Sequence, residues 1–286
     1  MQKRSRSVFL IVLVLFVISV AAGQDDKKLT FNFKKVQVPN SQATVIFGTN
    51  NRGAMVGYYI ASDGTEHGLL LQGENVTNID DPQGVNGSYC NNLNYMGTIV
   101  GYYYDSNNNV HGFEYQGGNF TDVGPAGFPS IAAGINAQGE IVGGYTNGVT
   151  HGYLWNGSEY VTLDVPGASQ TFAADINNRG RIVLDWIDSS GNYEGAIYNG
   201  KKYRTINVPG AVQSFPNALD STGDVVFSWE DSSSQFHGAL LQGKTFYTFD
   251  DPEAQGATYG SGINNHQVIV GYYSDGSAFW GFKARY

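Results

Sequence analysis

The sequence predicts an all-β protein that folds as a six-bladed β-propeller of four-stranded antiparallel blades. Three observations lead to this prediction. One repeat of about 43 residues occurs six times, each repeat divides into strand-like runs, and a run near the N-terminus supplies the strand that the last repeat lacks. Repeats of about 40 to 50 residues that form four short strands are typical of propeller blades.

The repeat is recognised by two markers. A glycine, usually preceded by histidine, recurs at intervals of 44, 40, 43, 43 and 43 residues. These glycines are Gly68, Gly112, Gly152, Gly195, Gly238 and Gly281. An asparagine or aspartate of a predicted turn keeps the same step, at Asn50, Asn94, Asn136, Asn177, Asp220 and Asn264. Two markers with one common step indicate six copies of one structural unit.

The fourth copy shows the four predicted strands, at residues 170–176, 181–187, 193–198 and 202–208. Asn and Gly separate the first run from the second and the third from the fourth, and these residues accept the positive φ angles of tight hairpin turns. With 38 Gly, 19 Tyr and 14% charged residues, the composition is that of a turn-rich β protein rather than a helical one.

The two ends of the chain complement each other. The sixth copy stops at Tyr286 after three runs, and residues 33–38 have the same pattern as residues 203–208, the fourth run of the fourth copy. We therefore expect residues 33–38 to complete the C-terminal blade and close the ring, which protects edge strands from aggregation. A linear β-solenoid is the alternative architecture, and it would not need complementary ends.

The copies also share short motifs, namely Val-Pro-Gly-Ala, Ile-Asn-Asn-Arg-Gly-Arg-Ile-Val and His-Gly-Phe. With these motifs the chain resembles the HAF repeats of extracellular bacterial proteins, over essentially all of its length after residue 23. The third and sixth copies follow the pattern most faithfully, whereas the fourth and fifth have Leu184 and Phe227 in place of a glycine. The resemblance implies an exported bacterial protein, and it implies no established activity.

The first 23 residues are predicted to be a signal peptide. Lys3, Arg4 and Arg6 provide a basic start, an apolar run covers residues 8–20, and small residues at 21–23 offer a cleavage site. A membrane anchor is the alternative, but the run of about fifteen residues is shorter than the roughly twenty that span a bilayer.

Cleavage there defines the expected organisation, with a signal peptide at 1–23, a short segment at 24–28 and the propeller at 29–286. The sequence thus predicts a secreted protein, extracellular or periplasmic, with no stable membrane insertion after cleavage. Three of the 16 basic residues precede the cleavage site, so 13 basic and 25 acidic residues remain, a net charge of about −12. This charge repels phosphate backbones, and we expect no nucleic-acid partner.

Four recurring histidines raise the question of a metal site. His67, His111, His151 and His237 fall on the predicted third strands of different blades, roughly 10 Å or more outside the innermost strands. A zinc ion needs its ligands within about 2.1 Å, so we expect these side chains to join strands by hydrogen bonds, with no metal and no cofactor. The single cysteine, Cys90, is expected to be a buried thiol.

The fourth and fifth copies share a departure that suggests a ligand site. Where other copies read Val-Gly-Tyr-Tyr, these two place a tryptophan at one matched position with acidic residues beside it. Aromatic rings flanked by carboxylates suit the apolar face and the hydroxyl groups of a sugar. The candidate glycan-binding residues are Asp185, Trp186, Asp188, Trp229, Glu230 and Asp231. The alternative interpretation is that bulkier side chains simply repack two blades.

Neither a nucleophile elbow, a zinc-protease motif nor a phosphate-binding loop occurs in the sequence. We therefore favour a secreted, non-catalytic binding or scaffold protein that recognises a polysaccharide or a cell-surface protein through loops of one propeller face. The alternative is an extracellular glycosidase or lyase on blades four and five, with Asp175 and Asp185 as acid and base. A structural surface protein without a small ligand is the third possibility.

Overall fold

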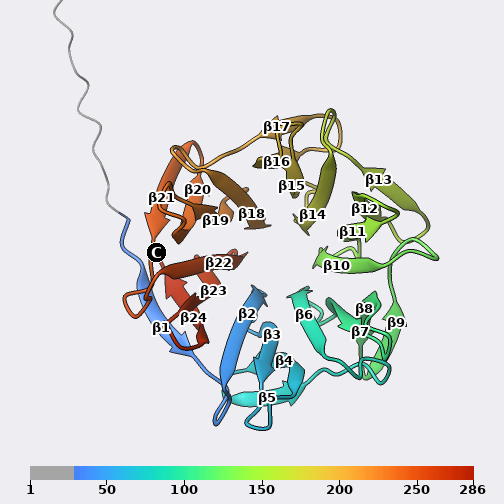
Figure 1. The fold of residues 1–286 in the computed structure, drawn as a ribbon, viewed down its shortest axis with the longest axis vertical. Helices are drawn as coiled ribbons and strands as arrows, with labels where there is room; N and C mark the ends of the chain where they lie inside the picture. Colours follow the sequence, from blue (N-terminus) through green and yellow to red (C-terminus); the bar gives the residue numbers. More distant parts are fainter. Residues whose placement is uncertain (1–28) are drawn as a thin grey trace, which may run out of the picture.

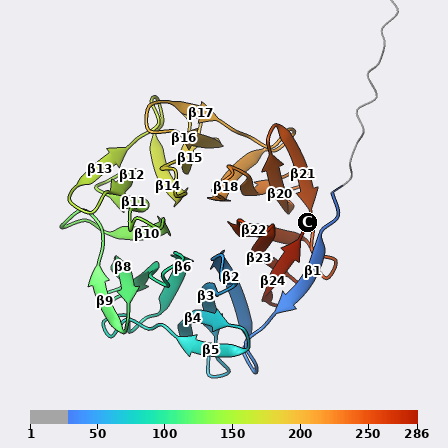
Figure 2. The ribbon, with the colours of Figure 1, turned by 180° about the vertical axis from the view of Figure 1, so that it is seen from behind.

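The computed structural model describes residues 29–286, which form a closed ring of six blades around a central axis (Figures 1 and 2). All regular structure in this part of the chain is β-strand. The predicted fold class is confirmed. The predicted signal peptide and the segment 24–28 lie outside the described residues. Within 29–286, no helix is long and apolar enough to cross a membrane.

Each blade consists of four antiparallel strands that follow one another from the axis outwards. The innermost strands of blades 1 to 6 are β2 (Ala43–Thr49), β6 (Ser88–Leu93), β10 (Ser130–Ile135), β14 (Gln170–Ile176), β18 (Gln213–Leu219) and β22 (Ala257–Asn264). The second strands are β3 (Met55–Ile60), β7 (Ile99–Tyr104), β11 (Ile141–Thr146), β15 (Ile182–Ile187), β19 (Val225–Glu230) and β23 (Val268–Ser274).

The third and fourth strands form the outer half of each blade. The third strands are β4 (Glu66–Gln72), β8 (Val110–Gln116), β12 (Thr150–Trp155), β16 (Tyr193–Tyr198), β20 (Phe236–Gln242) and β24 (Phe279–Arg285). The fourth strands of blades 1 to 5 are β5 (Asn75–Asn78), β9 (Asn119–Asp122), β13 (Tyr160–Leu163), β17 (Tyr203–Thr205) and β21 (Thr245–Phe249).

The fourth strand of blade 6 is β1 (Asn32–Val36), from the other end of the chain. It pairs antiparallel with β24, with Asn32 opposite Arg285 and Val36 opposite Gly281. Figure 1 shows this strand along the outer edge of the last blade. The prediction that residues 33–38 close the ring is therefore confirmed, with the strand beginning and ending slightly earlier than expected.

The apolar core lies between the blades rather than in one central mass. Six buried clusters are present in the described chain, and each combines residues of two consecutive blades. Val183 of blade 4 packs with Leu219 and Phe227 of blade 5 in one of them. Val36 of β1 joins Ile46 of blade 1 in another, so the closing strand also seals the junction between the last blade and the first.

The recurring histidines connect strands within a blade. His67, His151 and His237 contact, through Nδ1, the carboxylate of an aspartate just beyond the fourth strand, at 2.8 to 2.9 Å. This confirms their expected structural role. His111 differs, because its Nε2 atom approaches Asp105 of the preceding hairpin at 3.3 Å instead. No group of three or more metal-ligating side chains occurs between residues 29 and 286.

Each inner strand carries a β-bulge at the same place. The register with the second strand shifts by one residue in all six blades, for example between Ile46 and Gly48. One residue per blade is thus left unpaired, and a bulge of this kind re-aims a side chain. The unpaired residues are Phe47, Asn91, Ala133, Ala174, Asn217 and Ser261.

A ring of asparagines joins the blades at the end of the inner strands. The side-chain amide of Asn50 donates to the carbonyl oxygen of Asn94 in the next blade at 3.1 Å, while its Oδ1 atom accepts from the backbone of its own turn. Equivalent links run from Asn94, Asn136, Asn177 and Asn264 to the following blade, at 2.8 to 3.4 Å. The ring is interrupted only at blade 5, where Asp220 has no amide to donate to blade 6.

We predict that Asp220→Asn stabilises the protein by completing this ring. The asparagine Oδ1 keeps the turn contacts that Asp220 makes with Thr222 and Asp224, and its new amide reaches blade 6. One added hydrogen bond contributes about 1 kcal/mol, which raises the midpoint of thermal unfolding by roughly 2–4 °C in a domain of this size. Asp224→Asn is the control, because it removes the same charge without adding a link between blades. An equal rise in both variants would show a charge effect and contradict the prediction.

Candidate functional site

The order of the strands places two sets of loops on one face of the ring. The hairpins between second and third strands and the connections between blades share this face, which we call the top face. The turns that carry the asparagine ring lie on the opposite, bottom face. All six predicted glycan-binding residues lie toward the top face, as expected, at the ends of β15 and β19 or in the hairpins that follow them.

The two predicted aspartates in the hairpins stabilise those turns. Asp188 Oδ1 accepts hydrogen bonds from the backbone of Ser190 and Asn192, at 2.7 and 2.9 Å. Asp231 makes the same contacts with Ser233 and Gln235 in blade 5. Of the other predicted residues, Glu230 accepts a hydrogen bond from the Gln213 amide. These acidic side chains are occupied by local contacts and do not converge on a common point.

The two tryptophans take part in blade packing. Trp229 stacks on His237 with ring centroids 4.7 Å apart, as Tyr103 stacks on His111 at 5.0 Å, so tryptophan replaces the tyrosine of other blades. The indole Nε1 atoms of Trp186 and Trp229 are buried and have no hydrogen-bond partner among residues 29–286. Two cavities lie on the axis of the ring, one toward each face, and none of the six predicted residues lines either of them. A glycan site on these residues stays a prediction.

Asp185 differs from the other predicted acidic residues because its carboxyl group has no side-chain partner within the described chain. It is partly buried on β15 opposite Phe172, and no other side chain in the described chain forms a hydrogen bond or ion pair with it. Burial raises the pKa of its carboxyl group to about 7, because no positive charge compensates the loss of water.

Asp175 lies on the axis itself. Its carboxylate accepts hydrogen bonds from the Asn92 amide at 2.8 Å and from the backbone of Ile176 and Leu219 at 2.8 and 3.0 Å. Burial nevertheless raises its pKa to about 7. The three donors hold this carboxylate as a fixed acceptor that connects blades 2, 4 and 5, and neither Asp175 nor Asp185 lines the larger axial cavity.

That larger cavity has a volume of about 380 Å³, is open on the top face and is lined by residues of all six blades. Its lower wall is formed by the six residues that the β-bulges leave unpaired. The bulges therefore have a consequence for function, because they turn one side chain per blade toward a common space. The volume is within the range of about 300–1,000 Å³ found for small-molecule sites.

Seven of the fifteen residues that line the cavity are aromatic. A chain of ring contacts, with centroids 4.6 to 6.4 Å apart, runs from blade 5 through blade 6 to blade 1. Its members are Phe215, Phe236, Tyr259, Tyr272 and Phe47. Tyr102 of blade 2 and Phe172 of blade 4 also line the space, whereas blade 3 contributes only Ile131 and Ala133.

Uncharged polar groups complete the cavity. The amide nitrogens of Asn91 and Asn217 donate to carbonyl oxygens of the neighbouring blades, at 2.9 and 2.7 Å, and this fixes both side chains. Within the described chain, their Oδ1 atoms accept no hydrogen bond. Burial raises the pKa of Tyr102 and Tyr272, so both phenols stay protonated and can donate. No charged side chain lines this cavity.

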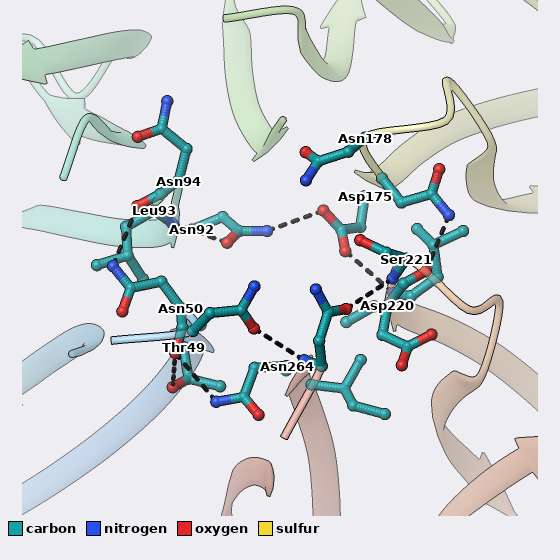
Figure 3. A pocket seen from close by; sticks show the side chains of 18 of the residues that line it. Thr49, Asn50, Asn92, Leu93, Asn94, Asp175, Asn178, Asp220, Ser221 and Asn264 are labelled. Carbon is teal, nitrogen blue, oxygen red and sulfur yellow. Dashed lines mark hydrogen bonds between the residues drawn. The ribbon is translucent and has the colours of Figure 1, made fainter. Parts of the chain in front are cut away.

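A second, smaller pocket of about 90 Å³ lies on the axis at the bottom face (Figure 3). It is polar, and its wall is formed by the residues of the asparagine ring and their neighbours. Asn92 lines both pockets, and its hydrogen bond to Asp175 crosses the space between them. The axial passage is divided at this pair.

The sequence predicts a site on the top face but not the axial cavity. One signal was present, namely a large aromatic residue two positions before the bulge in three inner strands, at Phe172, Phe215 and Tyr259. These residues could have been read as a ring around the axis. The bulges themselves have no marker in the sequence, so the residues that they turn toward the axis could not be identified.

No protein-family model and no curated protein matches this chain. Solved structures do match. A putative TolB from Agrobacterium tumefaciens is 15% identical, with 90% of this chain and 97% of that chain covered and a TM-score of 0.59. AofleA from Arthrobotrys oligospora is 12% identical, with 90% and 87% covered and a TM-score of 0.55.

A fungal lectin, Aleuria aurantia lectin, is 14% identical over 87% of this chain and 93% of that chain, with a TM-score of 0.50. That structure is described as a six-bladed β-propeller with a novel mode of fucose recognition. The likeness shows the propeller fold. At these identities it shows the fold alone, and the HAF-repeat resemblance stays a prediction.

We predict that Asp185→Asn stabilises the protein at alkaline pH. Folding raises the pKa of this group from 3.8 to about 7, so between about pH 4 and 7 the native state keeps a proton that the unfolded state has released. The contribution of Asp185 to the free energy of unfolding therefore falls as the pH rises through this window. Urea unfolding should show the variant to be more stable by about 2 kcal/mol at pH 8, with the difference vanishing near pH 4.

Asp188→Asn is the matched control in the same hairpin region. Hydrogen bonds from Asn192 lower the pKa of Asp188, so its carboxylate stabilises the fold above its unfolded pKa and loses this effect as the pH falls. The control should thus be less stable than the natural protein at neutral pH. A pH-independent difference for Asp185→Asn would disprove the assignment of the raised pKa.

Proposed function

We propose that the protein is a non-catalytic carbohydrate-binding propeller, and that the axial cavity of the top face is its glycan site. The observation that supports this most directly is the composition of the cavity wall, which combines aromatic rings with amide and hydroxyl groups. Sugars offer apolar C–H faces that stack on such rings, and hydroxyl groups that pair with such polar atoms. The absence of charge from the lining favours a neutral ligand.

The residues predicted on blades 4 and 5 are a second place where a glycan could bind on the same face. The cavity is favoured over them because it is concave and brings together side chains of all six blades. Two further features of the proposal come from the sequence alone. Residues 1–23 support export of the protein, and the top-face loops offer a surface for a polysaccharide or a cell-surface protein.

A glycan array probed with residues 24–286 tests this proposal, followed by titration calorimetry with the best ligand. Tyr272→Leu keeps much of the side-chain volume but removes a ring from the cavity wall, so we expect an affinity about tenfold lower. Tyr95→Leu is the matched control, because Tyr95 is an exposed aromatic residue on the bottom face.

Trp229→Leu in the same series tests whether the glycan binds on blades 4 and 5 instead of in the axial cavity. A loss of affinity in this variant with no change in Tyr272→Leu would move the site to blades 4 and 5. Equal affinity in all three variants, or no binding to any glycan on the array, would contradict the proposed function.

A further inference from the structure

We propose that the axial cavity binds the end of a glycan chain, with the terminal sugar inserted along the propeller axis and the rest of the chain leaving through the top face. This inference rests on the proposed function and adds the class of ligand, a neutral chain terminus. A chain that passes through the ring, or an internal segment bound in the cavity, is excluded by the way in which the axis is closed.

The first reason is the close approach of the inner strands just below the cavity. A Cβ atom on Gly134 would lie 2.7 Å from the Cα atom of Asp175, and one on Gly48 would lie 2.8 Å from the carbonyl oxygen of Asn91. Neither distance is possible for a real side chain. Glycine is therefore required at these positions, because the inner strands of neighbouring blades come into direct backbone contact just below the cavity.

The second reason is that two side chains meet across the axis at this level. Asn92 and Asp175 point toward each other from blades 2 and 4 and meet in a hydrogen bond of 2.8 Å (Figure 3). Asp175 is held from below by the Leu219 amide, and Asn92 Oδ1 accepts from the backbone of Leu93 at 2.7 Å. Both side chains are thus fixed, and they form a floor under the cavity.

The space below this floor is much smaller than the cavity above it. The bottom pocket has a volume of about 90 Å³, less than a quarter of the cavity above. Around it, the links of the asparagine ring hold neighbouring blades together, for example from Asn177 to Asp220 at 2.8 Å. A ligand that enters from the top face must stop at the floor.

The cavity presents groups for a sugar at its tip as well as at its sides. Asn91 and Asn217 project from the bulges just above the floor, with Oδ1 atoms that accept no hydrogen bond within residues 29–286. The rings of Tyr259 and Tyr272 lie on the side wall, stacked on each other at 4.6 Å. A terminal sugar can therefore bind by stacking at its side and by donating hydroxyl hydrogen bonds at its end.

The charge near the floor limits the kind of terminus. No positively charged side chain lines the cavity, and the Asp175 carboxyl group forms part of its floor. An anionic terminal sugar would be partly dehydrated here without a compensating positive charge, which is unfavourable. The geometry thus fits a neutral sugar at the end of a chain.

Neutral oligosaccharide ladders provide the test. Malto-, cello-, xylo- and manno-oligosaccharides of increasing length are titrated into the protein by calorimetry, and each ladder is also immobilised through its reducing end or through its opposite end. We expect one protein bound per chain at every length, and a loss of binding of at least tenfold when the required end is attached to the support. A cyclic oligosaccharide of the same linkage should not bind.

A number of bound proteins that grows with chain length, or equal binding of cyclic and linear forms, would overturn the inference while leaving the proposed function in place. If no ladder and no array glycan binds, both fail together.

A pair of variants tests whether the ligand occupies the lower part of the cavity. Ala174→Leu fills the lower cavity from one of the bulges, and Ala137→Leu makes the same change at an exposed position of the bottom pocket. We expect the first to weaken binding of the best ladder more than tenfold and the second to leave it unchanged. Thermal unfolding verifies that both variants fold, and unchanged binding by a folded Ala174→Leu variant would place the ligand outside the cavity.

Discussion

The inner strands of neighbouring blades approach each other so closely around the axis that three of the six positions at one level cannot carry a side chain. Gly48, Gly134 and Gly262 occupy three of the six crowded positions, and only Asn92 and Asp175 extend long side chains into the remaining space. The β-bulge just before this level turns one side chain of each strand toward the wider part of the ring. The cavity above and the polar pocket below are both set by this constriction.

The blades are held together by two kinds of contact that act at different distances from the axis. Apolar layers join the flat faces of neighbouring blades, and they supply most of the buried surface. Near the axis, the asparagine side chains set the orientation of neighbouring blades, because one atom of each amide stabilises its own turn and the other reaches the next blade. A residue chosen for a local turn thereby also fixes the angle between blades.

Much of the fold was readable from the sequence, because repeat spacing and hairpin signals depend on local chemistry. Residues 170–176 and 193–198 were predicted with the bounds that the structure shows. The site was harder to predict. Trp186 and Trp229 were recognised as a matched pair at the position of the tyrosines of other copies, but the stacking of Trp229 on the histidine of its blade was not predicted. Tyr272 and Asn217 were not recognised as site residues. The orientation of Asn217 depends on a one-residue register shift that the pattern of residue types does not reveal.

The shared last blade also has a consequence for the order of folding. β1 is the first strand of the described chain, yet its partner β24 is the last, so nearly the whole propeller lies between them in the sequence. Contacts between such distant segments carry a large entropic cost and form late. Until they do, β24 has an unpaired edge and the junction between blades 6 and 1 is open. Synthesis of the final strand is therefore the interval in which a nascent chain can most readily exchange β1 with a second copy of itself.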